Sequence, residues 1–146
     1  MNLKQELTDI AKKAQEASRF MLNVSSATKN TILKEMASSL MGKKDFILKA
    51  NKKDIAKAKV LGKSPAFIDR LTLNDKRIKE MSDSLTEIAR LSDPVGEVIK
   101  AWTRPNGLWI HKVRVPIGVI AIIYESRPNV TSDCIGLSLK SANSVI

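Results

Sequence analysis

The sequence of 146 residues contains one cysteine, Cys134, and one histidine, His111. A single cysteine excludes an internal disulfide, and no group of Cys, His and Asp residues has the spacing of a metal site. Cys134 follows Val130 at helical spacing inside an apolar stripe. Free cysteine is among the most buried residue types, and an activated thiol needs an accessible, electropositive site. We therefore expect Cys134 to be structural and expect no metal.

Long apolar runs are also missing. The longest, Val119 to Tyr124, is too short to cross a bilayer. The opening residues "MNLKQELTDIAKK" contain no apolar core of a secretory signal. Apolar residues at 43% and charged residues at 27% are ordinary values for a soluble globular protein. We expect a cytoplasmic protein with no membrane partner.

Acidic residues are too few to balance the basic ones, and the net charge is +10. Residues 1–60 hold 13 Lys/Arg against 6 Asp/Glu, whereas residues 116–146 hold two of each. The excess is mostly lysine interspersed with acids, and Arg19 is the only arginine before Arg70. Arginine is the residue that reads bases and clamps phosphates. A solvated lysine-rich face is therefore favoured over a nucleic-acid surface.

Residues 1–93 are dominated by apolar residues at helical spacing. The pattern predicts a helix over 2–22, a second helix capped by Thr28, and a third that ends near Val60 before Gly62. Ser64 followed by Pro65 predicts the start of a short helix, and Asn74 predicts the cap of a longer one that ends near residue 91.

In residues 94–115 the helical spacing of apolar residues gives way to a pattern typical of strands. The runs "EVIKAWTR" and "LWIHKVRV" are rich in β-forming residues and are joined by "PNG". Asn-Gly between two such runs is a strong hairpin signal. Apolar side chains fall on both faces of the second run, and a lone hairpin is marginal in water. We expect this hairpin to serve an interface between subunits.

Residues 116–146 have the order strand, loop, helix, strand. The run Val119–Tyr124 has no alternation, which is typical of a strand covered on both faces in a parallel sheet. Pro128 fits the first turn of a helix, and Val145-Ile146 begins another apolar run. This order predicts a βαβ unit whose second strand is cut short. A single unit cannot cover both faces of its strand, so we expect an incomplete α/β domain.

The polar loop "YESRPN", Tyr124 to Asn129, lies where open parallel sheets bind ligands. The following helix N-terminus attracts anions, Arg127 adds a guanidinium, and Asn129 adds amide donors. An anion site is one interpretation. The other is that Arg127 pairs with Glu125 or a neighbouring acid and that Asn129 caps the helix. Because this loop has no GxGxxG pattern, a dinucleotide site cannot rest on that fingerprint.

Several segments together resemble one enzyme family. "RVPIGVIAIIYESRPNVTSD" and "LKSANSVI" closely resemble the glutamate-5-semialdehyde dehydrogenases, also called γ-glutamyl phosphate reductases, of the aldehyde dehydrogenase superfamily. "FIDRLTLNDKRIKEM", "ARLSDPVGEVI" and "RPNGLWIHKVRVP" resemble the N-terminal third of that family. The "YESRPNVTSD" segment is the most specific. Ala142 departs from the pattern, because the family usually has glycine there.

The resemblance implies an aldehyde-dehydrogenase-like α/β fold in three parts. These are a helical part of the cofactor-binding domain (1–93), an oligomerisation hairpin (94–115) and the first βα unit of a Rossmann-type parallel sheet (116–146). It implies an oxidoreductase that reduces L-glutamyl 5-phosphate with NADPH in proline biosynthesis, acting as a homo-oligomer. The chain would be an incomplete N-terminal part, because the family's nucleophilic cysteine lies far downstream and Cys134 does not match it.

The resemblance also assigns residues of the polar loop. Tyr124, Glu125 and Ser126 would line the nicotinamide of NADPH, whereas Arg127 and Asn129 would face the substrate. No catalytic residue of the family falls in this chain, so we expect this chain alone to be inactive. The alternative is a non-catalytic, basic helical protein that binds a partner or a nucleic acid.

Overall fold

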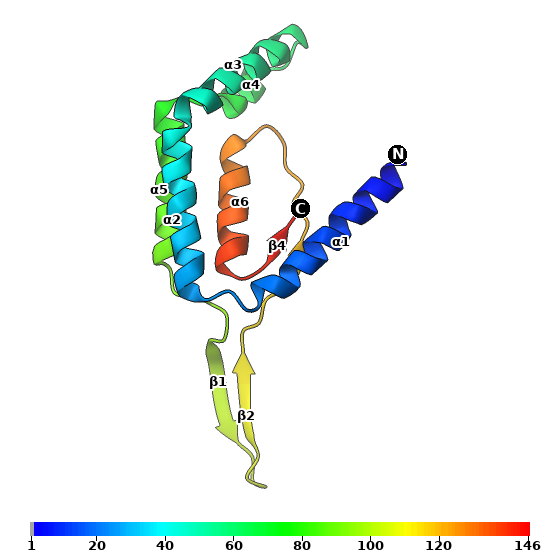
Figure 1. The fold of residues 1–146 in the computed structure, drawn as a ribbon, viewed down its shortest axis with the longest axis vertical. Helices are drawn as coiled ribbons and strands as arrows, with labels where there is room; N and C mark the ends of the chain where they lie inside the picture. Colours follow the sequence, from blue (N-terminus) through cyan, green and yellow to red (C-terminus); the bar gives the residue numbers. More distant parts are fainter. Residues whose placement is uncertain (1) are drawn as a thin grey trace.

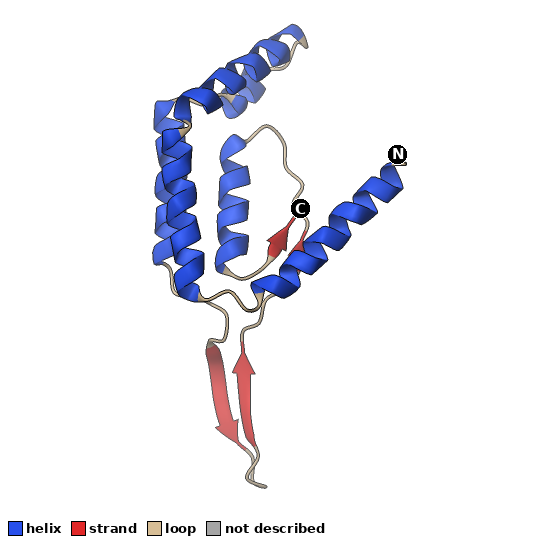
Figure 2. Ribbon diagram, in the orientation of Figure 1, coloured by secondary structure: helices blue, strands red, loops and turns tan. Residues whose placement is uncertain are grey.

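A computed structural model describes residues 2–146 and shows a helical layer, a projecting hairpin and a short parallel strand pair (Figure 1). The secondary structure is mostly helical (Figure 2). The helices are α1 Leu3–Met21, α2 Ser26–Gly42, α3 Lys44–Val60, α4 Pro65–Leu71, α5 Asp75–Arg90 and α6 Pro128–Lys140. The strands are β1 Val98–Thr103, β2 Trp109–Val113, β3 Val119–Ile120 and β4 Ser144–Val145.

The starts of the helices follow their capping residues. Ser64 accepts from the Phe67 N–H and Asn74 from the Arg77 N–H, as the sequence predicts. The predicted cap of α2 was wrong, because Ser25, not Thr28, holds the first turn. The Ser25 hydroxyl accepts from the Thr28 N–H at 3.1 Å. Helix α2 therefore begins most of a turn earlier than predicted.

The apolar core lies where α2, α5 and α6 pack side by side (Figure 1). Its buried members are Leu33, Ala37, Leu85, Ile88 and Ala89. Helix α6 approaches α5 closely because residue 136 is a glycine. A Cβ there would lie 2.7 Å from a methyl carbon of Leu85 and 3.1 Å from one of Ile88.

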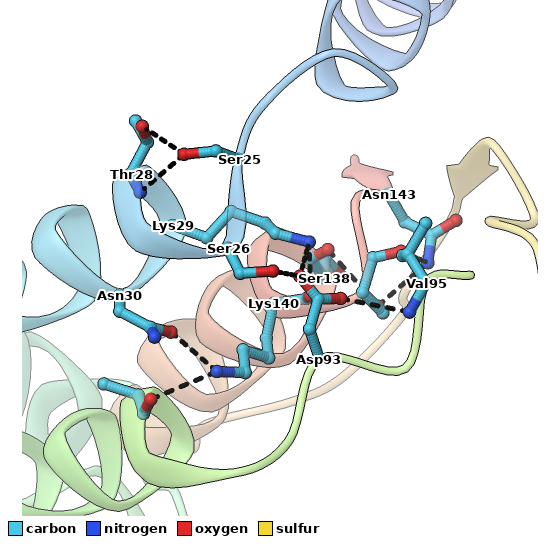
Figure 3. Close-up of polar contacts among 12 residues, drawn as sticks. Ser25, Ser26, Thr28, Lys29, Asn30, Asp93, Val95, Ser138, Lys140 and Asn143 are labelled. Carbon is cyan, nitrogen blue, oxygen red and sulfur yellow. Dashed lines mark hydrogen bonds and ion pairs between the residues drawn. The ribbon is translucent and has the colours of Figure 1, made fainter. Parts of the chain in front are cut away.

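A buried polar junction joins the start of α2 to the ends of α5 and α6 (Figure 3). Lys29 is 1% exposed, and its ammonium lies 2.5 Å from Asp93 and 3.2 Å from the Lys140 carbonyl. Lys140 is 3% exposed and donates to the Asn30 amide oxygen at 2.6 Å and to the Ala89 carbonyl at 3.1 Å. The prediction of a solvated lysine-rich face was therefore wrong for Lys29.

The junction pairs each charge with a helix end of opposite polarity. Lys29 binds a carbonyl in the last turn of α6, and Lys140 binds one in the last turn of α5. The Asp93 carboxylate accepts from Ser26 at the start of α2 and from the Val95 N–H. Cations are favoured at helix C-termini and anions at N-termini. The three helices are therefore held in register at the end of α6 opposite the polar loop.

The predicted hairpin is present and projects away from the helices (Figure 1). Strands β1 and β2 pair in an antiparallel register that matches Trp102 with Ile110. The turn closes with an Arg104 carbonyl that accepts from the Gly107 N–H at 2.9 Å. Gly107 has φ +82°, which glycine adopts without steric cost. All but one residue of the two strands are exposed.

The predicted parallel strand pair is present but shorter than expected. Val119 and Ile120 pair with β4, and the Ile122 N–H extends the ladder to the Ile146 carbonyl at 2.9 Å. The far end of the run is uncovered, as the sequence predicts for a single βα unit: Ile123 is fully exposed and Tyr124 is 46% exposed. Helices α1 and α6 contact β4 but leave the far end of the run uncovered.

Candidate functional site

The polar loop leads from β3 to the start of α6. Ser126 has φ +51°, in the left-handed region that non-glycine residues rarely adopt. Arg127 occupies the cap position of α6, and its side chain makes no capping hydrogen bond. The interpretation of Asn129 as the helix cap was therefore wrong, because Asn129 already lies in the first turn. No ion pair joins Arg127 to Glu125 in the described chain.

Arg127 and Asn129 lie on one wall of a groove of about 390 Å³. The start of α6 forms this wall, with Pro128 and Asp133. The opposite wall comes from α4, α5 and the link between them. Its residues are Asp69, Arg70, Thr72, Leu73, Arg77, Glu80, Met81 and Ser84. The groove thus joins segments that are far apart in the sequence.

The charged groups of the groove differ in what already binds them. Arg77 donates to the Thr72 carbonyl at 2.6 Å, to the Asp69 carbonyl, and to the Asp69 carboxylate at 3.1 Å. Its guanidinium is therefore committed to holding the link between α4 and α5. Neither Arg70 nor Arg127 has an ion pair or a side-chain hydrogen bond to any of residues 2–146. These two guanidiniums are free to take an anion.

The other predicted site residues lie beside this groove rather than on its walls. The Tyr124 hydroxyl is 2.5 Å from the Thr131 hydroxyl, which ties the start of the loop to α6. Glu125 is exposed and Ser126 is half-buried. Arg127 and Asn129 therefore line the groove, whereas the three residues assigned to the cofactor do not.

Sequence reasoning missed Arg70 and Asp133. Asp133 follows Asn129 by one helical turn, a spacing that puts both residues on one face of a helix. That signal was present in the sequence. No local signal indicates Arg70, because α4 reaches the groove only through the packing of α5 against α6.

A second, apolar groove of about 630 Å³ adjoins the first and shares Leu73, Met81 and Pro128 with it. It runs between α2, α5 and α6, and Met36, Leu40 and Ile135 add to its apolar lining. The two grooves together make one continuous surface that is polar at the α4 end and apolar along α2.

Cys134 and His111 lie apart from each other in the fold. Cys134 is on α6 and half-buried, less enclosed than predicted. His111 is on the exposed hairpin, where its ring centroid lies 5.5 Å from that of Trp109. Residues 2–146 contain no cluster of three or more His, Cys, Asp or Glu side chains suited to a metal ion. Nor does any helix in that range have the length and apolar character of a membrane span.

Comparison with known proteins gives a consistent result, although no protein-family model matches the chain. The chain is 52% identical over 146 residues to the gamma-glutamyl phosphate reductase of Thermodesulfovibrio yellowstonii. It is 54% identical over 136 residues to that of Caldanaerobacter subterraneus subsp. tengcongensis. These matches cover 100% and 93% of the chain but only 35% and 33% of the relatives.

Two crystal structures of gamma-glutamyl phosphate reductases have the same fold, each with a TM-score of 0.91. The Thermotoga maritima protein is 48% identical, and the match covers 96% of this chain and 34% of that one. The Saccharomyces cerevisiae protein is 34% identical, with 99% and 36% covered. The predicted resemblance is confirmed: in sequence and in fold, the chain is similar along nearly its whole length to about a third of a gamma-glutamyl phosphate reductase.

Proposed function

We propose that this chain supplies part of an enzyme that reduces L-glutamyl 5-phosphate to glutamate 5-semialdehyde and phosphate, using NADPH, in proline biosynthesis. The observation that carries the proposal is the 52% identity to a gamma-glutamyl phosphate reductase over all 146 residues.

In this proposal the groove binds the substrate. Glutamyl phosphate carries an acyl phosphate at one end, and phosphate is the leaving group. Arg127 offers an unpaired guanidinium at the start of α6, where the helix dipole also favours an anion. Arg127 neutralises the phosphate or the α-carboxylate of the substrate. Asn129 lies in the adjacent first turn of α6 and donates to a substrate oxygen or orders the loop.

In this proposal the nicotinamide ring of NADPH lies against Tyr124 and its neighbours. Tyr124 is 46% exposed and Ile123 fully exposed at the carboxyl end of the parallel strand pair, the edge at which such sheets bind ligands. NADPH would supply the hydride. Tyr124, held by its hydroxyl contact with Thr131, would orient the ring. Glu125 and the strained backbone of Ser126 would set the path of the loop around it.

The proposal also includes the oligomeric state of the enzyme and its location in the cell. The exposed hairpin β1–β2 would join subunits into a homo-oligomer, and the enzyme would act in the cytoplasm. The alternative of a non-catalytic basic protein is not favoured, because the relatives that match the chain are reductases.

The test uses the complete protein that contains this chain and follows oxidation of glutamate 5-semialdehyde with NADP and phosphate. We expect turnover, and we expect Arg127→Ala to lower kcat/KM roughly ten- to a hundredfold, the usual loss for one charge-assisted contact. The KM for NADP should stay unchanged. Arg19→Ala, an exposed arginine on α1, is the control. Weakened NADP binding with unchanged substrate kinetics would move Arg127 to the cofactor site.

A further inference from the structure

Besides Arg127, two charged groups of the groove have no counter-ion among residues 2–146. The Arg70 guanidinium lies in the last turn of α4 and has no partner among residues 2–146, because its neighbour Asp69 binds Arg77 instead. The Asp133 carboxylate accepts from the Ser84 hydroxyl at 2.9 Å and from the Asn129 amide at 3.5 Å. Both donors are neutral, so the charge of Asp133 also lacks a counter-ion in the described chain.

Glu80, the third acid of the groove after Asp69 and Asp133, has a counter-ion. Glu80 faces Lys76 at 3.8 Å, one helical turn away on α5. The groove therefore offers a cation from α4 and a carboxylate from α6, on opposite walls, each without a counter-ion among residues 2–146. An α-amino acid carries the complementary pair, a carboxylate and an ammonium on one carbon. Arginine forms paired hydrogen bonds with carboxylates, and a carboxylate accepts hydrogen bonds from an ammonium.

We propose that this groove is the subsite for the α-amino-acid end of the substrate, in which Arg70 binds the α-carboxylate and Asp133 binds the α-ammonium. This proposal rests on the proposed function and assigns the parts of the substrate. It leaves Arg127 for the phosphoryl end. Requiring both charges also makes the groove selective, since an aldehyde that lacks either group leaves a charged side chain unpaired.

The experiment compares three aldehydes as substrates of the complete protein with NADP and phosphate. Glutamate 5-semialdehyde carries both charged groups, 5-oxopentanoate lacks the ammonium, and 4-aminobutanal lacks the carboxylate. The variants are Arg70→Gln and Asp133→Asn. Their matched controls are Arg19→Gln on α1 and Asp54→Asn on α3, both exposed and outside the groove.

We expect Arg70→Gln to lower kcat/KM roughly ten- to a hundredfold for the two aldehydes that carry a carboxylate, the loss usual for one charged hydrogen bond. Its kcat/KM for 4-aminobutanal should be unchanged. Asp133→Asn should show the reverse pattern, losing activity with the two aldehydes that carry an ammonium and none with 5-oxopentanoate. Neither the KM for NADP nor the melting temperature should change with Arg70→Gln.

Equal losses with all three aldehydes, or no loss with any, would overturn the subsite. If Asp133→Asn lowers the melting temperature through loss of the Ser84 contact, the kcat/KM values of Arg70→Gln with the three aldehydes test the subsite by themselves. A wild-type protein that does not oxidise glutamate 5-semialdehyde contradicts the proposed function itself. An active wild type with unaffected variants contradicts the subsite only.

Discussion

Ala142, like Ser126, is a non-glycine residue with a positive φ. It has φ +55° just after α6 and is 2% exposed. The Asn143 N–H donates to the Ser138 carbonyl at 2.8 Å and the Ala142 N–H to the Leu139 carbonyl at 3.1 Å. This is the Schellman motif, in which glycine is usual at the left-handed position. The end of α3 has the same pair of bonds, with Gly62 at φ +65°.

We expect Ala142→Gly to raise the free energy of unfolding by up to about 1 kcal/mol, the cost of a left-handed alanine relative to glycine. Loss of the buried methyl group offsets part of the gain. Urea unfolding of the complete protein measures the change, and Gly62→Ala is the reciprocal control, expected to destabilise by a similar amount. A destabilised Ala142→Gly variant would mean that burial of the methyl group outweighs the backbone strain.

At the scale of elements, the Lys29–Asp93 ion pair connects the start of α2 with the ends of α5 and α6. Burial raises the pKa of the Asp93 carboxyl, but hydrogen bonds from Lys29, Ser26 and the Val95 N–H outweigh it and hold the pKa below its usual value of 3.8. Burial lowers the pKa of the Lys140 ammonium, and the nearby Asp93 only partly offsets this effect. The junction therefore depends on an ionised Asp93.

Because the pKa of Asp93 is lower in the folded state, its contribution to stability is present above pH 3.8 and is lost as the pH falls through the folded value. We expect Asp93→Asn to lower the free energy of unfolding at pH 7 by roughly 3–5 kcal/mol, since it leaves Lys29 buried without a counter-charge. The variant should also lose less stability than wild type between neutral pH and pH 3.

Unfolding curves of the complete protein at a series of pH values check both expectations. Asp83→Asn serves as the control, because Asp83 is exposed and pairs with Lys79 on the surface of α5. Surface pairs of this kind contribute little. Parallel pH curves for wild type and Asp93→Asn would show that Asp93 is not the titrating group.

At the scale of the whole molecule, the hairpin stands apart from the body and exposes large apolar side chains. Trp109 is 74% exposed and Trp102 38%, and Val98, Leu108 and Val113 are exposed as well. A two-stranded ribbon with no covering layer is marginal in water, and exposed apolar patches mark interaction sites. These features support the proposal that the hairpin joins subunits.

We expect the double variant Trp109→Lys, Val113→Lys to shift the sedimentation coefficient of the complete protein towards that of a monomer. The control is the double variant Val60→Lys, Leu61→Lys, which replaces two exposed apolar residues at the end of α3 by lysine. That variant should keep the mass of wild type. An unchanged mass for the hairpin variant would contradict the interface.

The sequence by itself determined the local elements. Ser64, Asn74 and the "PNG" turn mark their boundaries because capping and turn formation depend on neighbouring residues. Apolar residues at helical spacing predicted the helix after Asn74, and Ile78, Leu85 and Ile88 of α5 are buried. The order of strand, loop and helix placed Arg127 and Asn129 at the start of α6.

Only the tertiary structure decided what depends on contacts between distant segments. The sequence predicted that Lys29 belongs to a solvated lysine-rich face, yet packing of three helix ends buries it with Lys140 and Asp93. The apolar run from Val119 predicted a strand that one βα unit cannot cover, and the tertiary structure decided which part is protected, by pairing with β4 and by cover from α1 and α6. Arg70 joins Arg127 in one groove because α5 packs on α6, and no local pattern encodes the meeting of residues that far apart.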